Sequence, residues 1–239
     1  MIIDSHCHAG HADGLTNSYT TFEDICVSLS RMDDAGIDRA IVFPIATTKE
    51  ADEETASIVK QYPDRLWGYA KVSQERDAGQ VHARLRYAIQ ELGLVGLKLH
   101  GMLNRELMDA CEDLNIPVIV DPGHKPWGLQ WAAKAYPNVN VIIAHFGSFL
   151  SASEQAHQET IWMARKWPNI YLDTSGVMRF SWLEEAVREC GADKLIYGSD
   201  GPVVHTGMEL AKIRLLKLPQ DDLDKVLCKN IARIAHLQV

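Results

Sequence analysis

Residues 116–147 read IPVIVDPGHKPWGLQWAAKAYPNVNVIIAHFG, and they contain two apolar runs separated by a segment rich in aromatic and polar residues. Both runs are nearly continuous in apolar residues, as is typical of parallel strands whose two faces are covered. The step Tyr136-Pro137-Asn138 precedes the second run, and because proline restricts the residue before it, such a step ends a helix. This stretch therefore predicts a strand, a helix and a second, parallel strand.

The same pattern recurs along the whole chain. Two further aromatic–Pro–Asn/Asp steps, at 62–64 and 167–169, stand before apolar runs. Eight runs of strand character are present, at residues 1–8, 40–45, 66–72, 96–101, 116–123, 139–147, 169–176 and 194–201. Amphipathic segments predict helices, for example at residues 22–36, 78–93, 181–191 and 220–237.

Eight alternations of strand and helix favour a (β/α)8 TIM barrel. No Ser/Gly-rich or Pro-rich linker divides the chain, and the first run is not followed by the GxGxxG turn that would favour an open, doubly wound sheet. We therefore expect an α/β protein in which residues 1–239 form a single TIM-barrel domain.

The composition argues against several classes of protein. The chain carries a formal net charge of −8, whereas a nucleic-acid-binding surface needs clustered Lys and Arg. No apolar stretch is long enough to span a bilayer, and the N-terminus lacks the features of a cleaved leader, so we expect a cytoplasmic protein without membrane contact. The five cysteines show no CxxC spacing, which argues against a disulfide framework or a structural zinc knuckle.

The first run, MIIDSHCH, places His6 and His8 one residue apart. Side chains two positions apart in a strand point to the same face, so both imidazoles are expected at one side of the strand end. Cys7 is expected to point to the other side, where it packs. Two converging imidazoles make half of a metal site.

Other strand ends carry similar chemistry. Functional residues of a TIM barrel sit at the carboxyl ends of its strands. The later runs end in Lys98 and His100, in Asp121 with His124 just beyond it, in His145, in Asp173 and Thr174, and in Asp200. By contrast, His82, His157 and His236 are scattered without this relation to strand ends.

These residues predict a centre for one divalent metal ion. Imidazoles and carboxylates suit zinc, which we expect, with manganese or iron as alternatives. The expected ligands are His6, His8, Asp121, His145 and Asp200. Catalytic roles are expected for Asp200 as the group that shuttles a proton and for His145 as the group that polarises a substrate carbonyl. The alternatives are a turn-forming Asp200 ahead of Gly201 and a hydrogen-bonded core histidine at position 145.

The surrounding residues allow several roles. Lys98 is a third catalytic candidate: it either holds a substrate carboxylate, pairs with Asp121, or is carbamylated and bridges two metal ions. His100, His124 and Trp127 are expected to contact the substrate at the mouth of the barrel. The loops at residues 10–21 and 123–131 are expected to shape that pocket.

Taken in order, the motifs IIDSHCH, MDDAGIDRAIVFP, GLVGLKLHG, IPVIVDPG, YPNVNVIIAHFG, WPNIYLDTSG and GADKLIYGSDGP resemble the amidohydrolase superfamily. The similarity is to its amidohydrolase-related branch (amidohydrolase 2), which includes aminocarboxymuconate-semialdehyde decarboxylase-like proteins and lactone hydrolases. The resemblance implies a metal held by His6, His8 and Asp200, with His145 acting in catalysis or beside the metal. Barrels of this family often pair, so a homodimer is an alternative to a monomer.

One position departs from the branch. Its members usually have a ligand histidine where this chain has Asp121. A carboxylate makes the site harder and more negative, which favours manganese or an oxygen-rich zinc site. Alternatively, His124 replaces it as a ligand, or the site is weakened.

The leading functional hypothesis is a metal-dependent hydrolase that uses metal-activated water on a small, carboxylated lactone, amide or ester. The alternative is a non-oxidative, metal-dependent decarboxylase (a lyase) on the same scaffold. A catalytically silent binding barrel is the third reading, motivated by Asp121.

Overall fold

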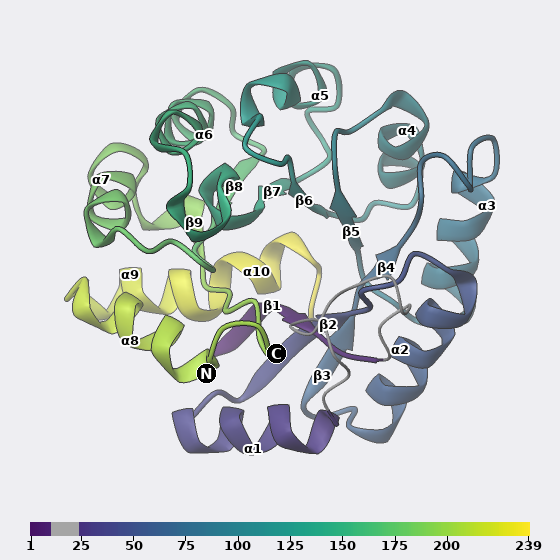
Figure 1. Ribbon diagram of the computed structural model, residues 1–239, viewed down its shortest axis with the longest axis horizontal. Helices are drawn as coiled ribbons and strands as arrows, with labels where there is room; N and C mark the ends of the chain where they lie inside the picture. The colour runs from purple at the N-terminus through teal and green to yellow at the C-terminus, as the bar shows by residue number, and fades with distance from the viewer. Residues whose placement is uncertain (11–23) are drawn as a thin grey trace.

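Parallel strands lie at the centre of the molecule and the helices surround them (Figure 1). This computed structural model describes residues 1–10 and 24–239. Its strands are β1 (Ile3–His8), β2 (Arg39–Phe43), β3 (Leu66–Gly68), β4 (Ala70–Lys71), β5 (Leu97–His100), β6 (Val118–Asp121), β7 (Val141–Ile143), β8 (Ile170–Asp173) and β9 (Leu195–Ile196). They form two parallel sheets, in the orders β1-β2-β3 and β4-β5-β6-β7-β8-β9.

Tyr69 joins the two sheets and divides the expected strand at 66–72 into β3 and β4. Its backbone N–H donates to Val42 O of β2 at 3.0 Å, whereas the next N–H, of Ala70, donates to Gly96 O at 2.8 Å. The chain thus changes its pairing partner from β2 to the β5 side at this residue.

The first strand lies beside the last one. Ser5 N donates to Tyr197 O at 3.0 Å, and Asp200 N donates to His6 O at 2.7 Å. These hydrogen bonds place the carboxyl end of β1 against the segment that follows β9. The expected TIM-barrel fold is therefore confirmed.

The helices are α1 (Ile25–Ala35), α2 (Lys49–Gln61), α3 (Val81–Arg86), α4 (Arg105–Asp113), α5 (Gln130–Ala135), α6 (Glu154–Lys166), α7 (Phe180–Cys190), α8 (Thr206–Leu215), α9 (Gln220–Asp224) and α10 (Asn230–Ile234). Two helices predicted as continuous instead contain π-helical turns, at Tyr87–Glu91 and Lys225–Lys229. No helix of the described part of the chain combines the length and apolar character needed to cross a membrane.

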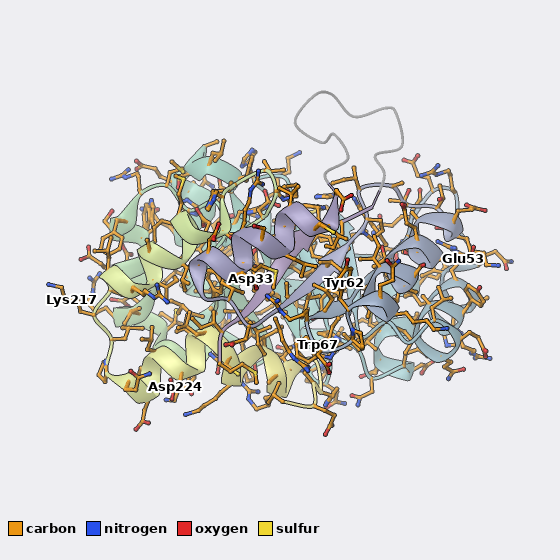
Figure 2. The ribbon with its side chains drawn as sticks, turned by 90° about the horizontal axis from the view of Figure 1, so that it is seen from below. Asp33, Glu53, Tyr62, Trp67, Lys217 and Asp224 are labelled. Carbon is orange, nitrogen blue, oxygen red and sulfur yellow. The ribbon has the colours of Figure 1, made fainter. Side chains whose placement is uncertain are left out.

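Charged side chains lie on the outside of this ring of helices. Figure 2 shows Asp33 on α1 and Lys217, beyond the end of α8, at the surface of the molecule, and both are exposed. The polar faces of the helices thus meet solvent, while their apolar faces cover the strands.

Helix α10 closes one end of the barrel. An inner apolar cluster combines strand residues such as Ile3, Ile119 and Ile142 with Ile231 and Ile234 of α10. Figure 1 shows α10 inside the ring formed by the outer helices. The carboxyl ends of the strands, which carry the polar side chains, are left for the opposite end.

We expect Ile231→Ala to lower the free energy of unfolding by about 2–5 kcal/mol, because Ile231 is fully buried in the inner cluster and its truncation leaves a cavity. Urea titration followed by circular dichroism measures this. Val239→Ala, at a side chain with 64% exposure, is the control and should change stability by less than about 0.5 kcal/mol. Equal stability of the two variants would contradict the packing of α10.

Candidate metal centre

His6, His8 and Asp200 converge at the carboxyl end of the barrel. Nε2 of His6 and Nε2 of His8 each lie 3.1 Å from Asp200 Oδ1. One ligand atom from each of the three residues can be chosen so that all lie within 4.8 Å of one another, and all three side chains are buried. Two imidazole nitrogens and a carboxylate oxygen form a donor set that suits a divalent ion.

Local structure explains this convergence. His6 and His8 share a face of β1, while Cys7 lies on the other side, in the outer apolar cluster, with Sγ 3.6 Å from Ser199 Oγ. Asp200 has φ of 61° and is followed by Gly201, and its carbonyl accepts from Val204 N at 3.2 Å, so the chain turns directly after it. Its carboxylate lies beside the two histidines, and the role of Asp200 as a ligand stays a prediction.

Asp173 orients His6. Nδ1 of His6 donates to Asp173 Oδ2 at 2.7 Å, and Ser175 Oγ donates to the same oxygen at 2.6 Å. Burial raises the pKa of Asp173, but the charge and hydrogen bond of His6 outweigh it and bring the pKa to about 2. A carboxylate that accepts from one nitrogen of a histidine fixes the other nitrogen as the ligand. Nε2 of His6 therefore faces Asp200.

A positive charge is favoured at this Nε2. Burial and Lys98 lower the pKa of His6, yet Asp173 and Asp200 outweigh them and raise it. In His8, by contrast, Nδ1 is buried and has no hydrogen-bond partner among the described residues. The orientation of the His8 ring therefore depends on the contacts of its Nε2. A cation bound among His6, His8 and Asp200 would account both for the raised pKa of His6 and for the unpartnered Nδ1 of His8.

His145 lies beside this group. Its ring centroid is 4.9 Å from that of His6, and its Nδ1 donates to Ser175 O at 3.1 Å. A carbonyl can only accept, so Nδ1 carries the hydrogen and Nε2 remains for another contact. Burial lowers the pKa of His145 and keeps the ring neutral. His145 is thus both a hydrogen-bonded buried histidine and a neighbour of the candidate ligands.

Lys98 reaches the same point from β5. Its side chain is fully buried, and Nζ lies 3.2 Å from His6 Nε2. Burial lowers the pKa of Lys98, while the carboxylates of Asp121, Asp200 and Asp173 oppose that effect. The ammonium group of Lys98 and a metal ion would therefore compete for the lone pair on Nε2 of a neutral His6.

The remaining expected residues lie farther out. Asp121 is half-buried, and its Oδ1 accepts from Gly123 N at 3.0 Å. Two groups of candidate ligands are found among the described residues, His6 with His8 and Asp200, and His6 with His145 and Asp173, and Asp121 belongs to neither group. His124 is exposed, with Nδ1 2.9 Å from Ser148 Oγ. Trp127 packs on Trp162 of α6, with ring centroids 4.9 Å apart.

His100 lies at the mouth. Its ring is stacked parallel to that of His8 at 6.5 Å, and it lines a cavity of about 460 Å³ together with Thr47, Lys71 and Ser73. Residues 11–21 of the first expected pocket loop lie outside the described part of the chain.

Two supporting residues were absent from the expected site residues. From the sequence, Asp173 is expected to be a hydrogen-bond acceptor behind a ligand or a polar strand-end residue, whereas Ser175, two residues later, is not identified. Ser175 connects Asp173 with His145 through its hydroxyl and its carbonyl. The one available signal was the polar run DTS at a strand end.

Glu209 of α8 supports this segment from outside. Its Oε2 accepts from Gly176 N at 3.0 Å and from Lys212 Nζ at 2.7 Å. Burial raises the pKa of Glu209 to about 7, against the opposing effect of Lys212.

This chain is similar to known proteins over most of its length. The amidohydrolase family model matches residues 3–236. Gamma-resorcylate decarboxylase from Polaromonas sp. is 24% identical over an alignment of 215 residues, and the match covers 65% of this chain and only 66% of that protein's length.

Solved structures show the same fold. A dihydroxybenzoic acid decarboxylase from Polaromonas sp., with bound manganese and the inhibitor 2-nitroresorcinol, has a TM-score of 0.75 at 17% identity, with coverage of 99% of this chain and 97% of that one. A probable 2-pyrone-4,6-dicarboxylic acid hydrolase from Acinetobacter baumannii has a TM-score of 0.77 at 18% identity, with coverage of 98% and 99%.

We expect Asp173→Asn to weaken binding of Mn²⁺ or Zn²⁺ by about 10- to 100-fold, because the amide no longer fixes His6 with Nε2 as the ligand. Competition with a chromogenic chelator measures the affinity. Asp64→Asn, at an exposed position, is the matched control. Unchanged affinity in Asp173→Asn would show that this carboxylate does not support the ligand set.

The pH dependence of stability tests Glu209. Because its pKa in the folded protein, about 7, exceeds the ordinary 4.5, the native state binds this proton more tightly than the unfolded chain does. The stabilisation is complete below pH 4.5 and is lost as the pH rises through about 7.

The free energy of unfolding of the metal-free wild type, relative to Glu209→Gln, should therefore fall between pH 4.5 and pH 8. Urea titrations at several pH values measure the difference. The exposed Glu184→Gln variant should follow the wild type, and a constant difference for Glu209→Gln would disprove the shift.

Proposed function

Because this chain belongs to the amidohydrolase family, whose model matches residues 3–236, we propose that it is a metal-dependent decarboxylase of a small hydroxylated aromatic acid. The observation that carries the proposal is the buried group of His6, His8 and Asp200 with the Lys98 ammonium against it. The names of two relatives, a gamma-resorcylate decarboxylase and a dihydroxybenzoic acid decarboxylase, support a lyase over the hydrolase expected from the sequence.

His6, His8 and Asp200 would hold one divalent ion. Manganese is supported by the Polaromonas structure, and zinc suits the same ligands. When bound, such an ion acts as a Lewis acid that polarises substrate oxygens and stabilises negative charge.

The charges of the site support an acid as the substrate. Three carboxylates, those of Asp121, Asp173 and Asp200, act on Lys98, and Lys71 of the neighbouring strand pairs with Lys98 in register. In their ordinary charged forms these five groups sum to −1. A bound divalent ion would change the sum to +1, which one substrate carboxylate would neutralise, so the acid would bind more tightly with the metal present.

Asp200 moves the proton. Burial raises its pKa, but hydrogen bonds with His6 and His8 outweigh this and hold the pKa well below its usual range. The ionised carboxylate first takes the proton of a substrate hydroxyl. It then gives that proton to the ring carbon that carries the carboxylate, as the bond between this carbon and the carboxylate breaks. The electron pair of the broken bond forms the new C–H bond, and CO2 leaves. A hydroxybenzoate anion thus becomes a phenolate and CO2, without an oxidant.

Other side chains hold the substrate. Nζ of Lys98 attracts its carboxylate, and Nε2 of His145 faces its oxygens because Nδ1 is held by Ser175. The cavity at His100, which Thr47 and Ser73 also line, would receive the ring and its hydroxyl groups.

A hydrolase is the second candidate. It is supported by the structural likeness to the probable 2-pyrone-4,6-dicarboxylic acid hydrolase. The same ion and the same Asp200 would then serve addition of water to a carbonyl, and the difference lies in the substrate.

The test incubates manganese- or zinc-loaded protein with 2,6-dihydroxybenzoate and, separately, with 2-pyrone-4,6-dicarboxylate. We expect 1,3-dihydroxybenzene and CO2 from the first compound, no activity after chelation, and a loss of about 10²- to 10⁴-fold in kcat for Asp200→Asn. His82→Ala, remote from the site, is the control. Ring opening of the pyrone without release of CO2 would establish the hydrolase. A protein that binds neither manganese nor zinc would instead support the third hypothesis, a catalytically silent binding barrel.

A further inference from the structure

The loop that carries His145 has an unfavourable backbone conformation. His145, Phe146, Leu150 and Ser151 have φ values of 56°, 48°, 52° and 54°, in the left-handed region that non-glycine residues avoid. Such conformations persist only where surrounding contacts impose them, and they gather at functional sites. Some contact outside the loop must therefore hold it.

His157 of α6 provides that contact. Its side chain is fully buried, with Nδ1 3.0 Å from Phe146 O and Nε2 2.9 Å from Ser151 Oγ. Because a carbonyl only accepts, Nδ1 carries the hydrogen and donates to Phe146 O. Nε2 then accepts from the Ser151 hydroxyl. One imidazole thus binds both left-handed segments of the loop.

The connection continues to the next strand end. Ser151 Oγ accepts from Met178 N at 3.0 Å, three residues after Ser175, whose carbonyl accepts from His145 Nδ1 at 3.1 Å. His157 therefore acts on His145 along two routes, through the backbone at Phe146 and through Ser151 to the loop after β8.

We propose that His157 is a positioning residue, which holds His145 in the orientation that its role requires. The inference rests on the proposed function only for the consequence that activity falls. The structural claim, that His157 holds the ring of His145 through the loop, stands on the contacts alone.

The experiment compares His157→Leu with Asn230→Ala in the full chain. Asn230 is also buried and donates to two backbone carbonyls, those of Ala192 and Leu195, but it belongs to α10 at the closed end of the barrel. Both variants lose two hydrogen bonds to neighbouring segments. Only His157→Leu loses contact with the loop of His145.

The first measurement is solvent exchange of the His145 Nδ1–H proton, followed by NMR of ¹⁵N-labelled imidazole rings. We expect at least about tenfold faster exchange in His157→Leu and unchanged exchange in Asn230→Ala, even where both lose similar thermal stability. The second measurement, on 2,6-dihydroxybenzoate, should show kcat about 10- to 100-fold lower in His157→Leu, with KM and metal content unchanged.

Equal exchange rates of His145 in the two variants would overturn the proposal, because His157 would then stabilise the fold and nothing more. Should the wild type lack decarboxylase activity, the exchange measurement still decides, so the two failures are distinguishable. Ser151→Ala removes one of the two hydrogen bonds of His157 and replaces His157→Leu where the latter does not fold. Unchanged exchange in Ser151→Ala would likewise overturn the proposal.

Discussion

The buried hydrogen bond from His6 Nδ1 to Asp173 Oδ2, 2.7 Å long, determines the chemistry of the centre. It assigns the hydrogen of His6 to Nδ1 and leaves Nε2 for Asp200 or a cation. The same carboxylate accepts from Ser175 Oγ, and the carbonyl of Ser175 holds His145. One ionised side chain therefore orients both the candidate ligand and the candidate catalytic histidine beside it.

Barrel geometry makes this contact available. His6 lies near the carboxyl end of the first strand, and Asp173 ends β8, 167 residues later. The hydrogen bonds between β1 and the segment after β9 bring Asp200 to the same point. Because parallel strands in a barrel all end on the same side, polar side chains from distant parts of the chain share one buried space there. Helix α10 covers the opposite end of the barrel with apolar side chains.

A decarboxylase and a hydrolase would use the same groups here. Both need a divalent ion among His6, His8 and Asp200, and both need a carboxylate that moves a proton. The distinction depends on which bond of the substrate lies next to Asp200, and thus on the pocket. The buried lysines favour an anionic acid in either case, and two of the named relatives are decarboxylases.

The sequence by itself determined the alternation of strands and helices, the pair of histidines on β1, and the strand ends where Lys98, His145 and Asp200 stand. These features are local, since side-chain periodicity specifies a face and a strand end specifies a position. Only the tertiary structure decided which side chains touch: it joined Asp173 and Ser175 to His6, left Asp121 outside both groups of candidate ligands, and gave the apparently scattered His157 two partners in the loop of His145. Hydrogen bonds at this mouth connect loops far apart in the chain, and no local pattern encodes those distances.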